Sequence, residues 1–492
     1  MAWLTKSRFL SGLQCHKRLW FEIHQPMEEP AETATALLQG RAFDQAVQEL
    51  LPGVVIARDD GMPAAIAQTK RVLADRKRAP STLHQGAFRA GDMAVITDVL
   101  RRAGPQFDLV EVKASTALKD THLPDAAFQV LVLQRAKIPV GKVFIGHVNN
   151  QFVLRRVGHY QGLLAEEDVT DEVHGYLPEA ATRALQFQEI MASGTMPTVA
   201  VGAHCLDPYE CPFLNRCTAG GRKPDYPVEL LPRGGKLVEE LLADGLQDLR
   251  DVPPKRLKNE MHRRVLDATV SGLPFFDFTA TAALRQLSGP FAYLDFETIS
   301  FSVPAVIGTR PYEQLPFQWS VHIEQSATDV RHAEYLAIES FGDFAAFADA
   351  LISALPATGT IFAYNATFEA GVLDRLADRL PLQAVALREI AGRLVDLLPI
   401  TREAYYHRDM RGSWSIKSVV PTIAPELGYE NLGEVREGDG AQQAFLELCS
   451  PGISPERTMA LKSALLRYCE HDTWVMVVLR RFLCGERFGA IA

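Results

Sequence analysis

Two acidic side chains lie two positions apart within a run of hydrophobic residues. Asp295 and Glu297 occur in "FAYLDFETIS", residues 291–300, whose apolar residues predict a buried β-strand. Side chains at i and i+2 of a strand point to the same face, so the two carboxylates repel each other unless a cation lies between them. The pair therefore predicts a site for divalent metal ions, and two such ions can hold the attacking and leaving oxygens of a phosphodiester.

Acids later in the chain have the right setting to complete this site. "IFAYNATFEAGVL" predicts the end of a strand followed by a helix that carries Glu369. "LLRYCEHDTWVMV" predicts a helix on which Tyr468 lies four residues before Asp472, on the same face. Each motif alone is common on ordinary strands and helices, but three in this order argue against coincidence. Asp396, in "RLVDLLPI", is a further acid that could replace or assist Glu369.

A second set of acids comes earlier in the chain. "GDMAVITDVLRRAGPQFDLVEVKAST" predicts two neighbouring strands, the first ending at Asp98 and the second carrying Glu111 and Lys113 on one face. Carboxylates are the ligands that Mg²⁺ and Mn²⁺ prefer, and a lysine beside them can activate water or stabilise charge developing at phosphorus. The next segment, "HLPDAAFQVLVLQRA", predicts a helix with Asp125 and Gln129 in its opening turns, from which Gln129 could reach the same metal.

The length and composition limit the class of protein. A chain of 492 residues is too long for one ordinary core and favours two or three domains. The net charge of −9 means that any binding of nucleic acid must use local basic patches. The sequence has no apolar run long enough to cross a bilayer, and its start lacks the apolar core of a signal peptide. We therefore expect a cytoplasmic protein without membrane contact.

Strand and helix patterns alternate in two blocks with a helical segment between them. Residues 31–195 show helical periodicity around a strand-rich centre at 85–160, and the alternation restarts near Gly289, so both blocks are expected to be α/β. Between them, residues 221–285 are rich in Gly and Pro at first and then helical. This connector has the turns of a helix-hairpin-helix that grips a phosphate backbone, although an ordinary helical linker explains it equally well.

The first block resembles the PD-(D/E)xK nucleases of the RecB type through Asp98, the "EVK" at Glu111 to Lys113, and Gln129. Its cysteines, one early and three late, resemble the iron–sulfur subgroup that includes the CRISPR adaptation nucleases and the AddB-type helicase-nucleases. The resemblance implies a restriction-endonuclease-like domain over residues 1–220. Many members have a histidine in the first helix after a glycine, where this chain offers Asp44 or Gln45.

The same resemblance implies that a [4Fe–4S] cluster joins the two ends of this domain through Cys15, Cys205, Cys211 and Cys217. Four thiolates suit either an iron–sulfur cluster or zinc. The wide intervals differ from the paired knuckle of a zinc finger, so we favour the cluster over zinc, and both over four unconnected cysteines. The other three cysteines have apolar neighbours and are expected to be small buried hydrophobes: Cys449, Cys469 and Cys484.

The second block resembles the DEDD exonucleases of the RNase H-like superfamily, in their tyrosine-bearing form, at five positions: Asp295, Glu297, Glu369, Tyr468 and Asp472. The resemblance implies a 3′→5′ exonuclease domain over residues 286–492, with acids that hold Mg²⁺ or Mn²⁺ and a tyrosine that positions the attacking water. The usual second acid is Asp, one methylene shorter than Glu369. With two further segments, 308–322 and 412–429, these motifs resemble an uncharacterised bacterial domain often found after a RecB-like nuclease.

Together the two blocks predict a phosphodiester hydrolase that degrades nucleic acid, from single-stranded ends, with two active sites and DNA favoured over RNA as the partner. Four residues of the additional segments could stack on bases or pair with phosphates: Arg310, Tyr312, Trp414 and Lys417. Core packing explains Tyr312 and Trp414 equally well. Two alternatives are a nucleic-acid-binding scaffold with a degenerate N-terminal site and an exoribonuclease that acts only through its C-terminal domain.

Overall fold

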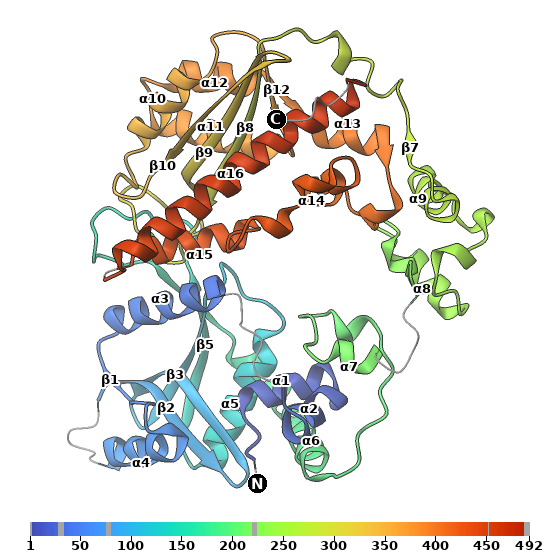
Figure 1. The fold of residues 1–492 in the computed structure, drawn as a ribbon. Helices are drawn as coiled ribbons and strands as arrows, with labels where there is room; N and C mark the ends of the chain where they lie inside the picture. Colours follow the sequence, from blue (N-terminus) through green and yellow to red (C-terminus); the bar gives the residue numbers. More distant parts are fainter. Residues whose placement is uncertain (1, 28–33, 75–79, 219–223, 451, 487–492) are drawn as a thin grey trace. The chain divides into compact units, whose positions relative to one another are not determined.

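The protein has a mixed α/β architecture with two compact units (Figure 1). Unit 1 is formed by Met1–Arg222 and Ser300–Glu313, and unit 2 by Lys223–Ile299 and Gln314–Ala492. The structure is a computed structural model that describes residues 2–27, 34–74, 80–218, 224–450 and 452–486. The two α/β blocks expected from the sequence are present, each around its own sheet.

A six-stranded sheet forms the centre of unit 1. Its strands lie in chain order, namely β1 (Val54–Val55), β2 (Thr82–Ala90), β3 (Met93–Ala103), β4 (Gln106–Lys113), β5 (Val140–Val148) and β6 (Leu164–Asp168). β2, β3 and β4 are antiparallel neighbours, whereas β4 and β5 are parallel. The chain crosses from β4 to β5 through helix α5 (His122–Arg135), which therefore lies next to the end of β4 that carries Glu111 and Lys113.

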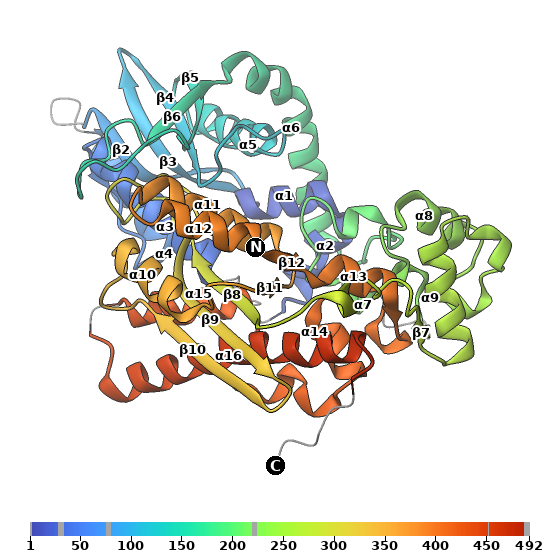
Figure 2. The same ribbon diagram turned by 90° about the horizontal axis from the view of Figure 1, so that it is seen from above.

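The helices of unit 1 pack around this sheet in two groups. α1 (Lys6–Gln14), α2 (His16–His24) and α6 (Thr170–Ala192) gather with α5, as both ribbon views show, and their aromatic residues share one core (Figures 1 and 2). The ring of Phe9 stacks on Phe128 at 4.5 Å and meets Phe187 edge-on at 5.4 Å. The remaining helices are α3 (Ala34–Leu50), α4 (Gly61–Ala74), the 3₁₀ turn η1 (Ala203–Cys205) and α7 (Leu214–Thr218).

The segment Ser300–Glu313, called here the inserted segment, follows the first strand of unit 2 in the chain but packs within unit 1. The backbone N–H of Ser302 donates to Oε1 of Gln39, and its hydroxyl donates to the Gln39 carbonyl at 2.7 Å. The Tyr312 hydroxyl donates to the carbonyl of Ala114 at 2.5 Å. Tyr312 also packs against the hydrophobic residues of this unit and has a φ of 58°, so it is a structural contact rather than a free base-stacking platform.

A five-stranded sheet forms the centre of unit 2. Its spatial order is β10 (Asp329–Leu336), β9 (Leu315–Ser326), β8 (Phe291–Ile299), β11 (Thr360–Ala363) and β12 (Leu394–Asp396). β8 is antiparallel to β9 and parallel to β11. The long helix α16 (Pro455–Leu483) packs along β8 and β9, whereas α10 (Phe344–Ala354), α11 (Thr367–Arg379) and α12 (Ala384–Gly392) lie on the other side of the sheet (Figure 2).

The described residues of the predicted connector pack into unit 2. Its helices α8 (Gly235–Ala243) and α9 (Glu260–Ser271) are separated by two 3₁₀ turns, η3 (Leu249–Asp251) and η4 (Pro254–Arg256). They share a hydrophobic core with helix α13 (Leu397–Ala404) and with the small sheet of β7 (Phe275–Phe276) and β13 (Tyr405–Tyr406). Short helices α14 (Ile416–Val419) and α15 (Gly438–Leu448) complete the unit. In this segment the structure thus shows two helices with intervening 3₁₀ turns.

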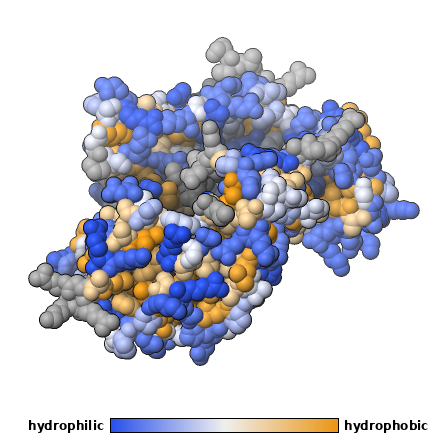
Figure 3. Space-filling view, turned by 90° about the horizontal axis from the view of Figure 1, so that it is seen from below, coloured by the Kyte–Doolittle hydropathy of each residue, from blue (hydrophilic) through white to orange (hydrophobic). Residues whose placement is uncertain are grey.

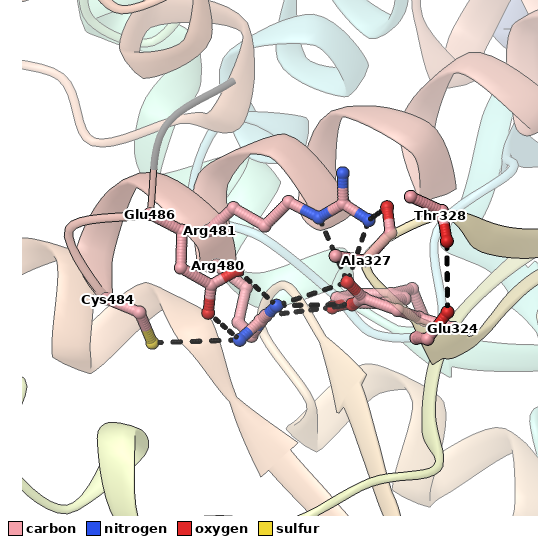
Figure 4. Close-up of polar contacts among 9 residues, drawn as sticks. Glu324, Ala327, Thr328, Arg480, Arg481, Cys484 and Glu486 are labelled. Atoms are coloured by element: carbon pink, nitrogen blue, oxygen red, sulfur yellow. Dashed lines mark hydrogen bonds and ion pairs between the residues drawn. The ribbon is translucent and has the colours of Figure 1, made fainter. Parts of the chain in front are cut away.

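A buried charge cluster joins α16 to the central strands of unit 2 (Figure 4). The Glu324 carboxylate is 4% exposed and accepts from Arg480 Nη2 at 3.2 Å and from Arg481 Nε at 2.9 Å. The Tyr293 hydroxyl donates to the same carboxylate at 2.5 Å and accepts from Arg480 Nε at 3.0 Å. Tyr293 lies two residues before Asp295 on β8. This charge cluster therefore fixes the position of α16 along the strand that carries Asp295 and Glu297.

The surface carries a mixture of hydrophilic and hydrophobic residues. On the face in Figure 3 the two kinds are interspersed. None of the helices within the described ranges combines the length and the apolar character that crossing a membrane requires.

Candidate functional site

Three carboxylates of unit 2 converge on one point. Asp295 and Glu297 come from β8 and Asp472 from α16, and their ligand oxygens all lie within 4.8 Å of one another. Burial, followed by repulsion from neighbouring acids, raises the pKa of Asp295 and of Glu297 well above their usual range. Burial also raises the pKa of Asp472 to about 6. Carboxylates that are difficult to ionise together are a favourable site for a divalent cation, which removes the repulsion.

Glu369 lies at the same site with one oxygen unpaired. It stands in the first turn of α11, directly after β11, and only 2% of it is exposed. Its Oε2 has no hydrogen-bond partner in the described part of the chain. Burial and then the charge of Asp295 raise the pKa of Glu369 to about 9. A buried carboxylate oxygen without a partner costs free energy, so its presence beside three other acids points to a ligand.

Asp396, which the sequence offered as a substitute for Glu369, has a different role. Its Oδ1 accepts from the backbone N–H of Asn365 at 2.9 Å and from that of Leu398 at 2.9 Å. The carboxylate therefore caps helix α13 and holds the turn between β11 and α11. Asp396 thus has a structural role through Oδ1, whereas Glu369 has a buried oxygen without a hydrogen-bond partner among the described residues.

Two tyrosines and a lysine surround Asp472. The hydroxyl of Tyr429 donates to Asp472 Oδ1, and a hydrogen bond from Tyr468 lowers the pKa of the same carboxyl against the effect of burial. Lys417 Nζ donates to the Tyr468 hydroxyl at 3.2 Å and lies 5.1 Å from the ring centres of both tyrosines. Tyr468 was predicted from its spacing, whereas Tyr429 was missed because a single tyrosine at the end of a loop carries no periodic signal.

Other residues that the sequence singled out have structural contacts. Trp414 is 5% exposed and its indole N–H donates to the Tyr405 carbonyl at 2.8 Å, so it belongs to the core. Cys469 is buried as expected, and its thiol lies 3.5 Å from Asp295 Oδ2, which places it against the acids. Cys449 is exposed, so the prediction that it is a buried hydrophobe was wrong, because α15 ends there at the surface. Cys484 is partly buried, at the end of α16.

The structure also brings together the predicted acids and lysine of unit 1. Lys113 Nζ lies 2.7 Å from Glu111 Oε1 and 2.5 Å from Asp125 Oδ2. Asp98 Oδ2 accepts from the backbone N–H of Val112 at 2.9 Å, next to Glu111 in β4. Burial and the Glu111 charge raise the pKa of Asp98 well above its usual range. Although burial opposes it, the lysine ammonium groups lower the pKa of Glu111 well below its usual range.

Three more side chains reach this set of acids. Gln129 Nε2 donates to Glu111 Oε2 at 2.6 Å and to Asp125 Oδ1 at 3.1 Å, as its place on α5 predicted. Asp44, in α3, has its pKa raised to about 6 by burial and by Glu111, so it faces the same acids. Lys6 Nζ lies 2.6 Å from Glu111 Oε1. Lys6 was missed because it stands far from Glu111 along the chain and belongs to no motif.

The four cysteines predicted as cluster ligands lie around one cavity. Cys15, Cys205, Cys211 and Cys217 line one small cavity of unit 1. Gln14, the neighbour of Cys15, donates through Nε2 to carbonyls of the late cysteine segment, at 2.8 Å for His204 and 2.6 Å for Tyr209. Burial raises the pKa of the Cys211 thiol, and nearby thiols act in the same direction. Four thiols around one cavity suit a cofactor that takes four thiolates.

A much larger cavity lies next to the acids of unit 1. It has a volume of about 1790 Å³ and is lined by Lys113 and Asp125 at one part and by residues of the cysteine segment, including Tyr209, at another. Arg8 and His122 also line it. This volume exceeds the roughly 300–1,000 Å³ of a typical small-molecule pocket.

Comparisons with known proteins give relatives without an assigned activity. Residues 292–415 match a family described as "Domain of unknown function (DUF2779)". That match includes Asp295, Glu297 and Glu369 but ends before Tyr468 and Asp472. "Uncharacterized protein MG366" of Mycoplasma genitalium is 25% identical over 218 residues, which is 40% of this chain and 32% of that protein. The "Uncharacterized protein MG366 homolog" of Mycoplasma pneumoniae is 25% identical, with 33% of its length covered. The chain thus spans about a third of these relatives.

Proposed function

We propose that the protein is a metal-dependent nuclease and that unit 2 is a 3′→5′ exonuclease of the RNase H-like, tyrosine-bearing DEDD type. The observation that carries this proposal is the convergence of Asp295, Glu297 and Asp472 beside the unpaired oxygen of Glu369. The order β10-β9-β8-β11-β12, with β8 central and parallel to β11, supports the same fold. A site of this type would lie where two parallel strands and a packed helix bring their acids together. Here β8 carries Asp295 and Glu297, and α16 carries Asp472.

The chain's own residues would divide the work at this site. The four acids would hold Mg²⁺ or Mn²⁺, which supplies charge stabilisation for both the attacking and the leaving oxygen. Tyr468 would orient the attacking water, because its hydroxyl already lies against Asp472 and Lys417. Lys417 is a positive charge that lowers the pKa of the acids, and it would attract a phosphate of the strand end. Tyr429 would keep Asp472 in its orientation.

For unit 1 we propose a RecB-like PD-(D/E)xK nuclease domain. Asp98, Glu111 and Asp44 would hold the metal, with Gln129 fixing the orientation of Glu111. Lys113 would stabilise the charge that develops on the phosphate, since its ammonium lies among the acids at the edge of the large cavity. The cavity would take the polynucleotide, and we favour DNA over RNA as the substrate.

The cysteines support a structural cofactor in the same domain. Cys15, Cys205, Cys211 and Cys217 would bind a [4Fe–4S] cluster, which would join the start of unit 1 to its late segment. Among the described residues, the sulfur atoms of these four cysteines are not all close enough together to hold a single metal ion.

The test is a nuclease assay on the purified full-length chain. End-labelled single- and double-stranded DNA and RNA would be incubated with Mg²⁺, Mn²⁺ or EDTA, using wild type, Glu111→Gln, Asp472→Asn and the double variant. Glu470→Gln is the matched control, because Glu470 is an exposed acid on the same helix as Asp472. We expect stepwise 3′→5′ products that require metal and disappear in Asp472→Asn. Degradation that persists in EDTA, or in the double variant, would overturn the proposal.

A further inference from the structure

A lysine from the first helix lies on the central acid of unit 1. Lys6 Nζ is 2.6 Å from Glu111 Oε1 and 3.7 Å from Asp125 Oδ2. The Glu111 side chain is fully buried, and the Lys6 side chain is 28% exposed. This is a close charge-assisted contact between residues far apart in the sequence, at the position where a metal ligand is proposed.

The fold fixes the segment before Lys6 and thereby aims its side chain. Leu4 forms an isolated β-bridge with Met93, in which its N–H donates to the Asp92 carbonyl at 2.8 Å and its carbonyl accepts from Ala94 N–H at 3.1 Å. Thr5 caps α1, so Lys6 is the first residue of the helix. The β-bridge of Leu4 and the start of α1 together fix the backbone on both sides of Lys6. The direction in which the Lys6 side chain leaves the backbone is therefore determined by the fold.

Lys6 and Lys113 use the same oxygen atoms. Lys113 Nζ lies 2.7 Å from Glu111 Oε1, the atom that Lys6 also contacts, and both lysines face Asp125 Oδ2. The other oxygen of Glu111 accepts from Gln129 at 2.6 Å. Each oxygen of Glu111 thus has a donor. Lys6 and Lys113 together occupy both acceptor sites of Oε1, so a divalent ion that binds this oxygen must displace one of them. The side chain with the weaker second contact is Lys6, which lies 3.7 Å from Asp125 Oδ2, whereas Lys113 lies 2.5 Å from that atom.

We propose that Lys6 is a tethered cation that competes with divalent metal ions for Glu111 and so sets the metal concentration at which unit 1 becomes active. The inference rests on the proposed metal site of unit 1 and adds a residue that weakens metal binding there. Removing the ammonium leaves Oε1 to the metal and to Lys113, and the metal no longer has to break a charge-assisted hydrogen bond. The expected gain in metal affinity is about tenfold.

The test is calorimetric titration of the full-length chain with Mn²⁺. Asp295→Asn and Asp472→Asn would be present in every sample, so that unit 2 contributes no binding. On this background Lys6→Met is compared with Lys6→Arg and with Arg41→Met. Arg41 is an exposed residue of α3 that lines the same cavity as Lys113, so Arg41→Met removes one positive charge nearby without touching Glu111. Thermal melting without metal shows whether each variant is folded.

Lys6→Met should bind Mn²⁺ about tenfold more tightly, whereas Lys6→Arg and Arg41→Met should stay within about twofold of the background. Unchanged or weaker binding in a folded Lys6→Met variant would overturn the inference, since a lysine that only organises the acids would weaken the site when removed. An equal gain in Arg41→Met would overturn it too, because the effect would then be one of general charge. Failure of every sample to bind Mn²⁺ would instead refute the metal site of unit 1.

Discussion

Glu369 gives the sharpest prediction, because a buried acid with a raised pKa makes stability depend on pH. Its pKa is raised to about 9 from an ordinary 4.5, mainly by burial and then by the charge of Asp295. In the presence of a chelator, the folded chain keeps a proton on Glu369 between these two values, whereas the unfolded chain has lost it. The contribution of Glu369 to stability should therefore be fully present below about pH 4.5 and should be lost as the pH rises toward 9.

The size of the effect follows from the same shift. One proton bound only in the folded state changes the free energy of unfolding by at most about 1.4 kcal/mol for each pH unit. Between pH 5 and pH 8 this single group can thus remove up to about 4 kcal/mol. Glu369→Gln cannot ionise and should lose this part of the slope. Asp295 and Glu297 still contribute to the pH dependence of stability. The free energy of unfolding of the variant should therefore change with pH less steeply than that of wild type, but still measurably.

Hydrogen exchange is the assay that reports on this unit alone. Exchange of amides in β8 and α16 would be compared between wild type and Glu369→Gln in EDTA, at each pH from 5 to 8. Comparing the two proteins at equal pH cancels the intrinsic exchange rate. The protection of wild type should fall relative to the variant as the pH rises. Asp374→Asn, an exposed acid of the same helix, should follow wild type.

At pH 8, added Mn²⁺ should make the amides of wild type better protected than those of Glu369→Gln. The ionised Glu369 then gains a metal partner, whereas the amide of the variant does not. Parallel pH profiles for wild type and Glu369→Gln in EDTA would refute the reasoning. They would mean that the carboxylate is solvated in solution and that its unpaired oxygen does not mark a metal position.

Other substitutions test the remaining parts. Lys417→Met should slow exonuclease cleavage on the order of tenfold to a hundredfold, and Lys417→Arg should restore part of the rate, as measured in single turnovers. Glu324→Gln should lower the stability of unit 2 by about 1–3 kcal/mol in denaturant unfolding, because it removes the carboxylate shared by Arg480 and Arg481 while Arg480 keeps only Glu486 among the described acids. Cys211→Ser should remove the bound iron and the brown colour of anaerobically purified protein, whereas stoichiometric zinc in wild type would contradict a cluster. Lys113→Ala should abolish the products of unit 1 alone, so an unchanged product pattern would mean that this unit does not cleave.

The sequence could predict the elements that carry the acids, because their signals are local. The run of apolar residues around Asp295 predicted β8, and the spacing of Tyr468 and Asp472 predicted one helical face, now seen in α16. The i, i+2 pair of Glu111 and Lys113 likewise lies on one strand. In each of these cases the residues that determine the element are its own neighbours in the chain.

Lys6, Tyr429 and the packing of the connector could not be predicted, because each depends on contacts between distant residues. Lys6 reaches Glu111 only because Leu4 pairs with Met93, and nothing near Lys6 encodes that pairing. Tyr429 reaches Asp472 from the first position of a three-residue 3₁₀ turn, Tyr429–Asn431, which is too short to show a periodic pattern. The Gly- and Pro-rich start of the connector suggested a separate linker, yet its later apolar residues find partners in unit 2.

The inserted segment has a consequence for how the protein can be divided. Because Ser302 and Tyr312 bond within unit 1 although they follow β8 in the chain, residues 1–222 do not contain all of that unit. A polypeptide that stops there would leave the Gln39 carbonyl and the Ala114 carbonyl without these partners and would expose the hydrophobic residues that Tyr312 covers. A single proteolytic cut after residue 223 would likewise yield fragments that stay associated. The two units have separate cores but are interleaved in their covalent order, so no single cut of the chain separates one complete unit from the other.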